Sequence, residues 1–266
     1  LEEIEPIAEH FCENFDDVII LGTGGSSLGG QTLCSLAIPS GSARPVLHFM
    51  DNIDPHSFDL LFNKIKPERT SFIVISKSGH TAETLAQFLY CIDVFRSQNS
   101  GKSNALNIIN HFLIITESGD RPLRRLADKW QIKVIDYDPL IGGRYSVLAI
   151  PSLLPTLIAG VDAYEVRKGA ARVINQVLSA NTVKECPPVL GALLNVALAK
   201  ENNIHTTVLM PYLDRLNCFG SWFQQLWAES LGKNGQGTTP IRARGAVDQH
   251  SQLQLYLDGP KDKLIT

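Results

Sequence analysis

The sequence of 266 residues is poor in the features that mark secreted, metal-binding and membrane proteins. Its five cysteines are odd in number and form no C-x-x-C pair, which favours reduced thiols in a cytoplasmic protein. Its seven histidines form no H-E-x-x-H spacing, so we expect no metal site. The longest apolar run, residues 147–161, is too short for a membrane span and contains two prolines. The acidic opening, LEEIEPIAEH, lacks the basic start of a signal peptide.

Neither sign of charge is in large excess. The formal net charge is -3, and no block of five like charges occurs. Nucleic acid and acidic membrane surfaces are therefore poor candidate partners. Hydrophobic residues make up 44% of the chain, which is enough for one large core or two smaller ones.

Short β-branched runs alternate with helical patterns along most of the chain, which predicts an α/β protein of three αβα layers with parallel sheets. Strands are predicted at 18–21, 46–50, 71–75, 112–116, 133–136, 206–210 and 253–257, and helices at 27–37, 55–65, 81–95, 121–130, 163–179, 189–200 and 213–231. We expect a first domain at 1–140, a helical connector at 141–184 and a second domain at 185–266. The second domain is short, so we expect it to be partial.

Two loops that follow predicted strands carry anion-binding chemistry. The first, ILGTGGSSLGG at 20–30, has glycines that let backbone N–H groups approach an anion at the start of a helix. It is not a dinucleotide fingerprint, because Ser27 replaces the third glycine. It is not a P-loop, because Gly30 stands where lysine is required. The alternative is an ordinary tight turn between strand and helix.

The second loop is VISKSGHTAET at 74–84. Three hydroxyls, those of Ser76, Ser78 and Thr81, can donate hydrogen bonds, and Gly79 permits the positive φ of an anion-binding nest. The pattern predicts a cradle for a phosphate monoester. The alternatives are that Thr81 only caps a helix and that Lys77 only points to solvent. Ligands of open parallel sheets bind beyond the carboxyl ends of the strands, so we expect both loops to hold one phosphorylated ligand.

Five segments, in order, resemble the glucose-6-phosphate isomerase (phosphoglucose isomerase) family of the sugar isomerase (SIS) superfamily. They are GTGGSSLGG (22–30), SKSGHTAET (76–84), GGRYSVLAIPSLLP (142–155), MPYLDRLNCFGSWFQQLWAESLGK (210–233) and GAVDQHSQLQLYLDGP (245–260). Gly79-His80 and Leu231 depart from the commoner family pattern. The resemblance implies two SIS-like (flavodoxin-like) domains, the second incomplete. It also implies that the sequence is a fragment lacking N- and C-terminal parts, including a late lysine near the substrate.

The activity that the resemblance implies is interconversion of glucose-6-phosphate and fructose-6-phosphate through a cis-enediolate. Such a reaction needs a base, a cation near the developing oxyanion and an acid that opens the sugar ring, and it needs no cofactor. A dual glucose/mannose-6-phosphate isomerase and a non-catalytic SIS-type regulator are the alternatives. The regulator would not need a base, a cation and a ring-opening acid together.

Residue roles follow from matching these segments to the family. Glu229 is the candidate base, with Trp222, Phe223 and Trp227 nearby in sequence to desolvate it in part. Arg144 would stabilise the enediolate, with Glu83 as its partner. His250 would open the ring, reaching the site from the neighbouring subunit of a homodimer. Gln225 would contact the substrate. The implied phosphate ligands are Gly25, Ser26, Ser76, Lys77 through its backbone, Ser78 and Thr81.

Overall fold

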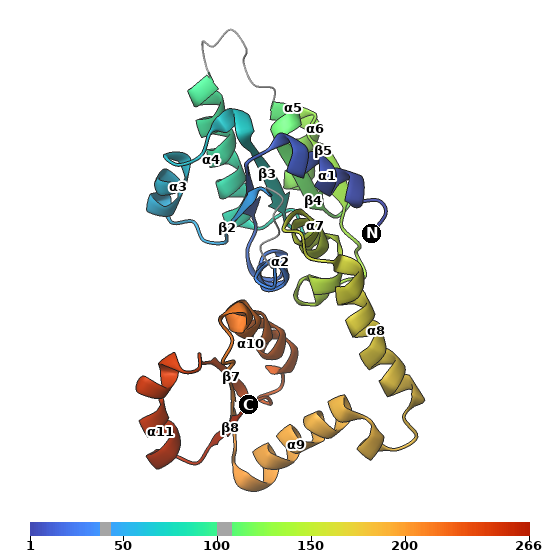
Figure 1. The fold of residues 1–266 in the computed structure, drawn as a ribbon, viewed down its shortest axis with the longest axis vertical. Coiled ribbons are helices and arrows are strands. Elements are labelled where there is room, and N and C mark those ends of the chain that lie inside the picture. The colour runs from blue at the N-terminus through green and yellow to red at the C-terminus, as the bar shows by residue number, and fades with distance from the viewer. Residues whose placement is uncertain (38–43, 100–107) are drawn as a thin grey trace. The chain divides into compact units, whose positions relative to one another are not determined.

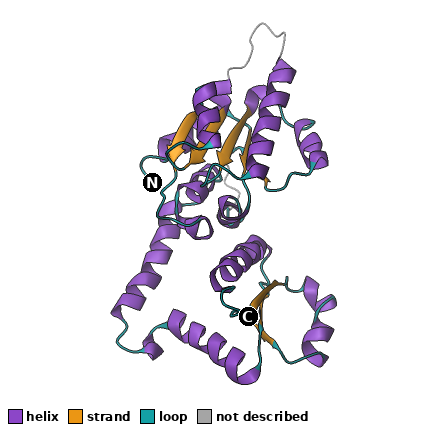
Figure 2. Ribbon diagram, turned by 180° about the vertical axis from the view of Figure 1, so that it is seen from behind, coloured by secondary structure: helices purple, strands orange, loops and turns teal. Residues whose placement is uncertain are grey.

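The computed structural model describes residues 1–37, 44–99 and 108–266, which form two compact units, Leu1–Val161 and Asp162–Thr266 (Figures 1 and 2). The boundary between the units falls inside the segment 141–184 that the sequence predicts as a helical connector. Residues of that segment are helical on both sides of the boundary, in α7 (Ile150–Ile158) and α8 (Ala163–Ser179). Because α7 packs against α1 (Glu5–Asn14) and α2 (Leu28–Cys34), residues up to Val161 belong to the first unit.

The first unit is built on a five-stranded parallel sheet of order β2-β1-β3-β4-β5. Leu21, the last residue of β1, pairs with Val74 near the end of β3, so the loops that follow these strands leave the same edge of the sheet. The order 2-1-3-4-5 is that of flavodoxin-like folds. The predicted strands are confirmed to within a residue, as β1 (Asp17–Leu21), β2 (Val46–Met50), β3 (Thr70–Ile75), β4 (Phe112–Thr116) and β5 (Lys133–Asp136).

Helices cover both faces of this sheet, which confirms the three-layer architecture. Alternate strand residues point to opposite faces, so strands covered on both sides are apolar throughout. One face packs against α3 (Pro55–Phe62), α4 (Ala82–Asn99) and α6 (Pro122–Trp130), whose core includes the stacked rings of Phe72 and Phe112, 4.4 Å apart. The helices α1, α2 and α7 pack against one another, and α5 (Ile108–His111) is a single turn before β4. No helix in the described parts of the chain is long and apolar enough to cross a membrane.

The second unit holds a three-stranded parallel sheet of order β7-β6-β8. Its elements after α8 are α9 (Pro187–Asn202), β6 (Thr206–Leu209), α10 (Asn217–Leu231), β7 (Thr239–Arg242), α11 (Leu253–Asp258) and β8 (Lys263–Ile265). Val208, Ala243 and Tyr256 form its small buried core. The helix α10, which carries two candidate site residues, packs against β7.

One predicted strand is wrong. Residues 253–257, LQLYL, alternate apolar and polar side chains as a strand would, but they form α11, with Tyr256 packed on Val208 and Ala243. The strand β7 pairs with β6 instead. It was not predicted because Pro240 lies within it. Proline lacks an N–H, so it is tolerated here because β7 is at the edge of the described sheet.

Candidate active site

The glycine-serine loop after β1 lies against the end of β3. A β-carbon on Gly22 would lie 2.9 Å from the carbonyl oxygen of Ile75 and 3.1 Å from Cβ of Ser26. Only glycine lets the chain pass this closely. Ser26, in the short helical turn Gly24–Ser26, therefore lies next to the point where the serine-rich loop leaves β3. The two loops that the sequence singles out come together at one edge of the sheet.

A third segment, Gly142 to Ser146, closes on the same loop. A β-carbon on Gly25 would lie 2.3 Å from both the carbonyl carbon and the oxygen of Gly143 and 2.8 Å from the nitrogen of Arg144. The buried hydroxyl of Ser146 lies 2.9 Å from the carbonyl oxygen of Gly25 and 2.7 Å from that of Gly143, and it bonds to both. These contacts hold the backbone of Arg144 beside the loop that carries Ser26.

The loop after β3 is shaped by its own hydroxyls. The hydroxyl of Ser76, which is 2% exposed, accepts from the Gly79 N–H at 3.1 Å and lies 3.1 Å from the Thr81 hydroxyl. Ser78 is exposed, and its hydroxyl accepts from the His80 N–H at 3.2 Å. Thr81 directly precedes α4, at the positive end of that helix. Such a loop presents hydroxyls and a helix N-terminus to an anion.

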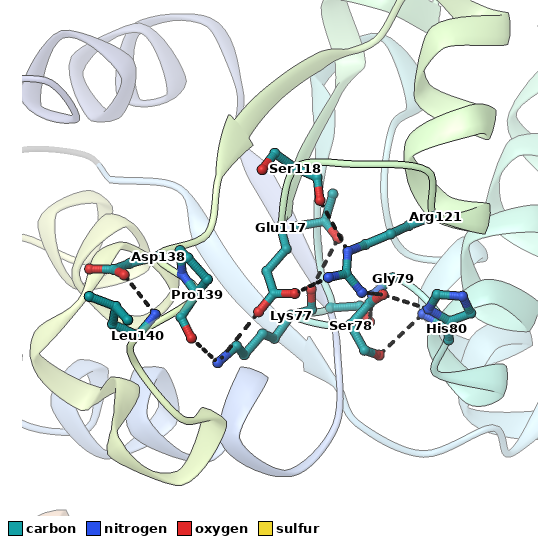
Figure 3. A network of polar contacts seen from close by, with 12 residues as sticks. Lys77, Ser78, Gly79, His80, Glu117, Ser118, Arg121, Asp138, Pro139 and Leu140 are labelled. Atoms are coloured by element: carbon teal, nitrogen blue, oxygen red, sulfur yellow. Dashed lines mark hydrogen bonds and ion pairs between the residues drawn. The ribbon is translucent and has the colours of Figure 1, made fainter.

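Gly79 adopts the positive φ that the sequence predicts, at +66°. A β-carbon there would lie 3.0 Å from Cβ of Arg121 and 3.1 Å from the hydroxyl of Thr116. The Arg121 guanidinium supports the loop from this side, donating to the carbonyls of Ser78 at 3.0 Å and Ser118 at 3.2 Å. Arg121 also pairs with Glu117 (Figure 3).

Lys77 does not point to solvent, as an ordinary surface lysine would. Its ammonium donates to the carbonyl oxygen of Pro139 at 2.9 Å and pairs with Glu117 at 3.5 Å (Figure 3). It also donates to the carbonyl oxygen of Ile141 at 2.8 Å. The ammonium lies 5.7 Å from the ring centre of Tyr137, whose burial raises the pKa of its phenol. The predicted phosphate contact of Lys77 involves its backbone, so it is compatible with this placement of the side chain and stays a prediction.

Arg144 is half-buried, and its guanidinium lies 4.6 Å from the ring centre of Tyr145, within the range of a cation–π contact. Glu83 is exposed in the first turn of α4, the helix that begins after Thr81. Its predicted pairing with Arg144 stays a prediction.

The second unit carries Gln225 and Glu229 one turn apart on α10. The Gln225 amide donates to the Glu229 carboxylate at 3.1 Å, so one predicted site residue orients the other. Glu229 is exposed, and the neighbouring aromatic residues do not bury it within this unit. Trp227 instead donates its indole N–H to the Thr238 hydroxyl at 2.9 Å, beside β7, and its ring packs on Phe223.

His250 ends a short helical turn, Val247–His250, and is exposed. Asp248 holds this turn together, accepting from the Arg244 N–H at 2.6 Å and from the Ser251 hydroxyl at 2.8 Å. These two hydrogen bonds, that of Ser251 first, lower the pKa of the Asp248 carboxyl. The imidazole is therefore carried on a loop held by hydrogen bonds and is exposed in the second unit, and its role in ring opening stays a prediction.

Two residues of the first unit were missed by sequence reasoning. Glu117 and Arg121 lie after β4, and they connect the loop after β3 to the loop after β5 through Lys77 and Ser78. The only sequence signal was their position, in ESGDR directly after a buried strand. Their side-chain partners come from loops far apart in the chain, and no local pattern predicts such pairs.

The fold is that of sugar isomerase proteins. The structure matches a solved tagatose-6-phosphate ketose/aldose isomerase from Escherichia coli at a TM-score of 0.56 and 13% identity, covering 99% of this chain and 66% of that one. It matches a solved glucose-6-phosphate isomerase from Chlamydia trachomatis more closely, at a TM-score of 0.80 and 27% identity, covering 97% of this chain and 50% of that one.

The sequence comparisons specify the family. The family model described as phosphoglucose isomerase matches residues 8–248, and the chain belongs to this family. It is 36% identical over 259 residues to a probable glucose-6-phosphate isomerase from Methanococcus maripaludis, and 38% identical over 255 residues to a glucose-6-phosphate isomerase from Rubrobacter xylanophilus. These matches cover 96% and 94% of this chain but 57% and 58% of the relatives. The chain thus spans little more than half of their length.

Proposed function

We propose that the protein carrying this chain interconverts glucose-6-phosphate and fructose-6-phosphate. The observation that carries the proposal is the meeting of two hydroxyl-rich loops and the Arg144 segment at one sheet edge, in a chain of the phosphoglucose isomerase family. In this proposal the phosphate is held by donors of Gly25, Ser26, Ser76, Ser78 and Thr81 and by the Lys77 backbone.

The chemistry assigned to the site moves one proton between C1 and C2 of the sugar, while the hydroxyl proton passes between O2 and O1 of the enediolate. The Glu229 carboxylate, oriented by Gln225, removes the proton from one carbon and returns it to the other. Arg144, with Glu83 as its partner, stabilises the enediolate without supplying a proton, because arginine stays charged. His250 donates a proton to the ring oxygen and recovers it. None of these steps requires a cofactor.

The first experiment uses the full-length protein with fructose-6-phosphate and measures glucose-6-phosphate and mannose-6-phosphate. We expect glucose-6-phosphate alone. Formation of both products would make the enzyme a dual isomerase. Binding of fructose-6-phosphate without turnover would contradict the proposal and indicate a regulator.

Substitution of Glu229 tests the base. We expect Glu229→Gln to retain affinity for the substrate and to lose at least ~10²-fold in kcat, because the amide cannot accept the proton. The matched control is Glu201→Gln, which changes an exposed glutamate of α9. A Glu229→Gln enzyme with the kcat of the control would remove Glu229 from this role.

We further propose a cytoplasmic homodimer in which His250 completes the partner's site. None of the five cysteines, all of which lie in the described parts of the chain, forms a disulfide, as a reducing compartment favours, and His250 is exposed on its turn. The test mixes two inactive variants, Glu229→Gln and His250→Ala, after dissociation and reassembly. Each mixed dimer would hold one unaltered site, so activity should recover to roughly a quarter of that of the wild type. No recovery would place His250 and Glu229 of one chain in the same site.

A further inference from the structure

The side chain of Lys77 has a role that phosphate binding does not explain. An ammonium group has three N–H donors. Two of them are taken by the carbonyl oxygens of Pro139 and Ile141, at 2.9 and 2.8 Å, and the Glu117 carboxylate faces the group at 3.5 Å. The lysine side chain is 26% exposed, and that of Glu117 is 13% exposed, so solvent screens the pair only in part. The ammonium therefore binds two backbone carbonyls and a carboxylate of the protein itself.

The carbonyls that hold Lys77 belong to the segment that leads to Arg144. Ile141 is followed directly by Gly142, Gly143 and Arg144. On the far side of this segment the Ser146 hydroxyl bonds to the carbonyls of Gly25 and Gly143. The backbone of Arg144 is therefore fixed at two points, by Ser146 against the loop after β1 and by Lys77 against the loop after β3.

Glu117 makes this attachment part of a wider network (Figure 3). One carboxylate oxygen faces Lys77 and the other pairs with Arg121, whose guanidinium donates to the Ser78 carbonyl at 3.0 Å. The Glu117 N–H also donates to the Lys77 carbonyl at 3.1 Å. Ion pairs and charge-assisted hydrogen bonds, which are stronger than neutral ones, therefore connect the loop after β3 to the segment before Arg144.

We propose that Lys77 is a positioning residue, whose ammonium holds the segment 139–143 so that Arg144 stands at a fixed distance from the phosphate loop. The inference deepens the proposed function and rests on it for the role of Arg144. The Lys77 side chain then couples phosphate binding by the loop after β3 to the position of the Arg144 guanidinium beside C1 and C2 of the sugar. The expected consequence is a change in kcat with little change in phosphate affinity.

The test compares full-length wild type with Lys77→Met, which keeps the length of the stem and removes the ammonium. We expect kcat to fall tenfold to a hundredfold, because misplacing a group by about 1 Å costs up to ~10²-fold. The inhibition constant of inorganic phosphate should stay within about twofold of the wild type, since the backbone donors remain. Lys77→Arg, which can also donate to two carbonyls, should restore most of kcat.

Hydrogen exchange gives a second measurement that needs no activity. Amides of 138–146 should exchange faster in Lys77→Met than in the wild type, and those of Lys129→Met should not. Lys129 is an exposed lysine of α6 in the same unit, 5.8 Å from the ring centre of Trp130. If Lys77→Met fails to fold, Glu117→Gln, which keeps the lysine, should show the same changes at smaller size.

The outcomes separate this inference from the proposed function. A phosphate inhibition constant that weakens in step with kcat/KM would make the ammonium a phosphate ligand and overturn the inference. Unchanged exchange at 138–146 together with unchanged kcat would also overturn it. A wild-type protein without isomerase turnover would refute the proposed function, and the exchange of 138–146 would still decide whether Lys77 holds that segment.

Discussion

Replacing Gly25 with alanine would force apart two segments of the candidate site. The added β-carbon would lie 2.3 Å from the carbonyl carbon and oxygen of Gly143, where ordinary contact begins at 3.4 Å. The atoms it meets are backbone, so no side chain can rotate away. Gly25 and Gly143 must therefore separate by about 1 Å. Gly25 has no positive φ, so alanine adds no backbone strain of its own.

The cost of this separation can be measured in stability and in activity. Overpacking of a well-packed contact destabilises by about 1–3 kcal/mol, which we expect as the loss in free energy of unfolding in urea. A displacement of about 1 Å at Arg144 should lower kcat/KM by up to ~10²-fold. The stability control is Gly143→Ala, whose β-carbon would meet no atom within 4 Å. Equal unfolding free energies for Gly25→Ala and Gly143→Ala would refute the reasoning.

Two further predictions concern buried groups of the first unit. Burial lowers the pKa of His111, and its hydrogen bond to the Thr70 carbonyl opposes this shift only in part. Folding therefore favours the neutral ring, so His111 contributes stability at pH values above 6.5, its ordinary pKa, and this contribution is lost as the pH falls below that value. The free energy of unfolding should depend less on pH between 8 and 5.5 in His111→Asn than in the wild type, and identical slopes would contradict this. Burial also raises the pKa of the fully buried Cys91 thiol, so a thiol reagent should leave Cys91 unmodified in the native protein while it modifies the half-buried Cys218. Mass spectrometry showing labelled Cys91 before unfolding would contradict this burial.

The first unit was largely predictable because its central strands, β1, β3 and β4, are mainly apolar and its helices are separated by turn residues. The five strands from Val18 to Asp136 follow from that alternation alone. The second unit was less predictable, because its described sheet is small and carries weaker signals. Residues 253–257 read as a strand by alternation but form a helix, in which Leu253 and Tyr256, three positions apart, are less exposed than Leu255 and Leu257.

The candidate site divides in the same way. Glycines and hydroxyls directly after a strand are a local signal, so the loops that carry Ser26 and Ser76 could be recognised from sequence. The network of Lys77, Glu117 and Arg121 could not, because it joins loops that follow three different strands. The contact between Gly25 and Gly143 could not be predicted either, because the two residues lie far apart in the sequence and no local pattern links them.

We propose that the loops after β1 and β3 together hold one phosphate. A crystal structure of the full-length protein with fructose-6-phosphate tests it most directly. We predict that oxygens of a single phosphoryl group lie within hydrogen-bonding distance, ~2.7–3.2 Å, of donors on both Ser26 and Thr81. A phosphoryl group bound to one of these loops alone, or away from this edge of the sheet, would contradict the account.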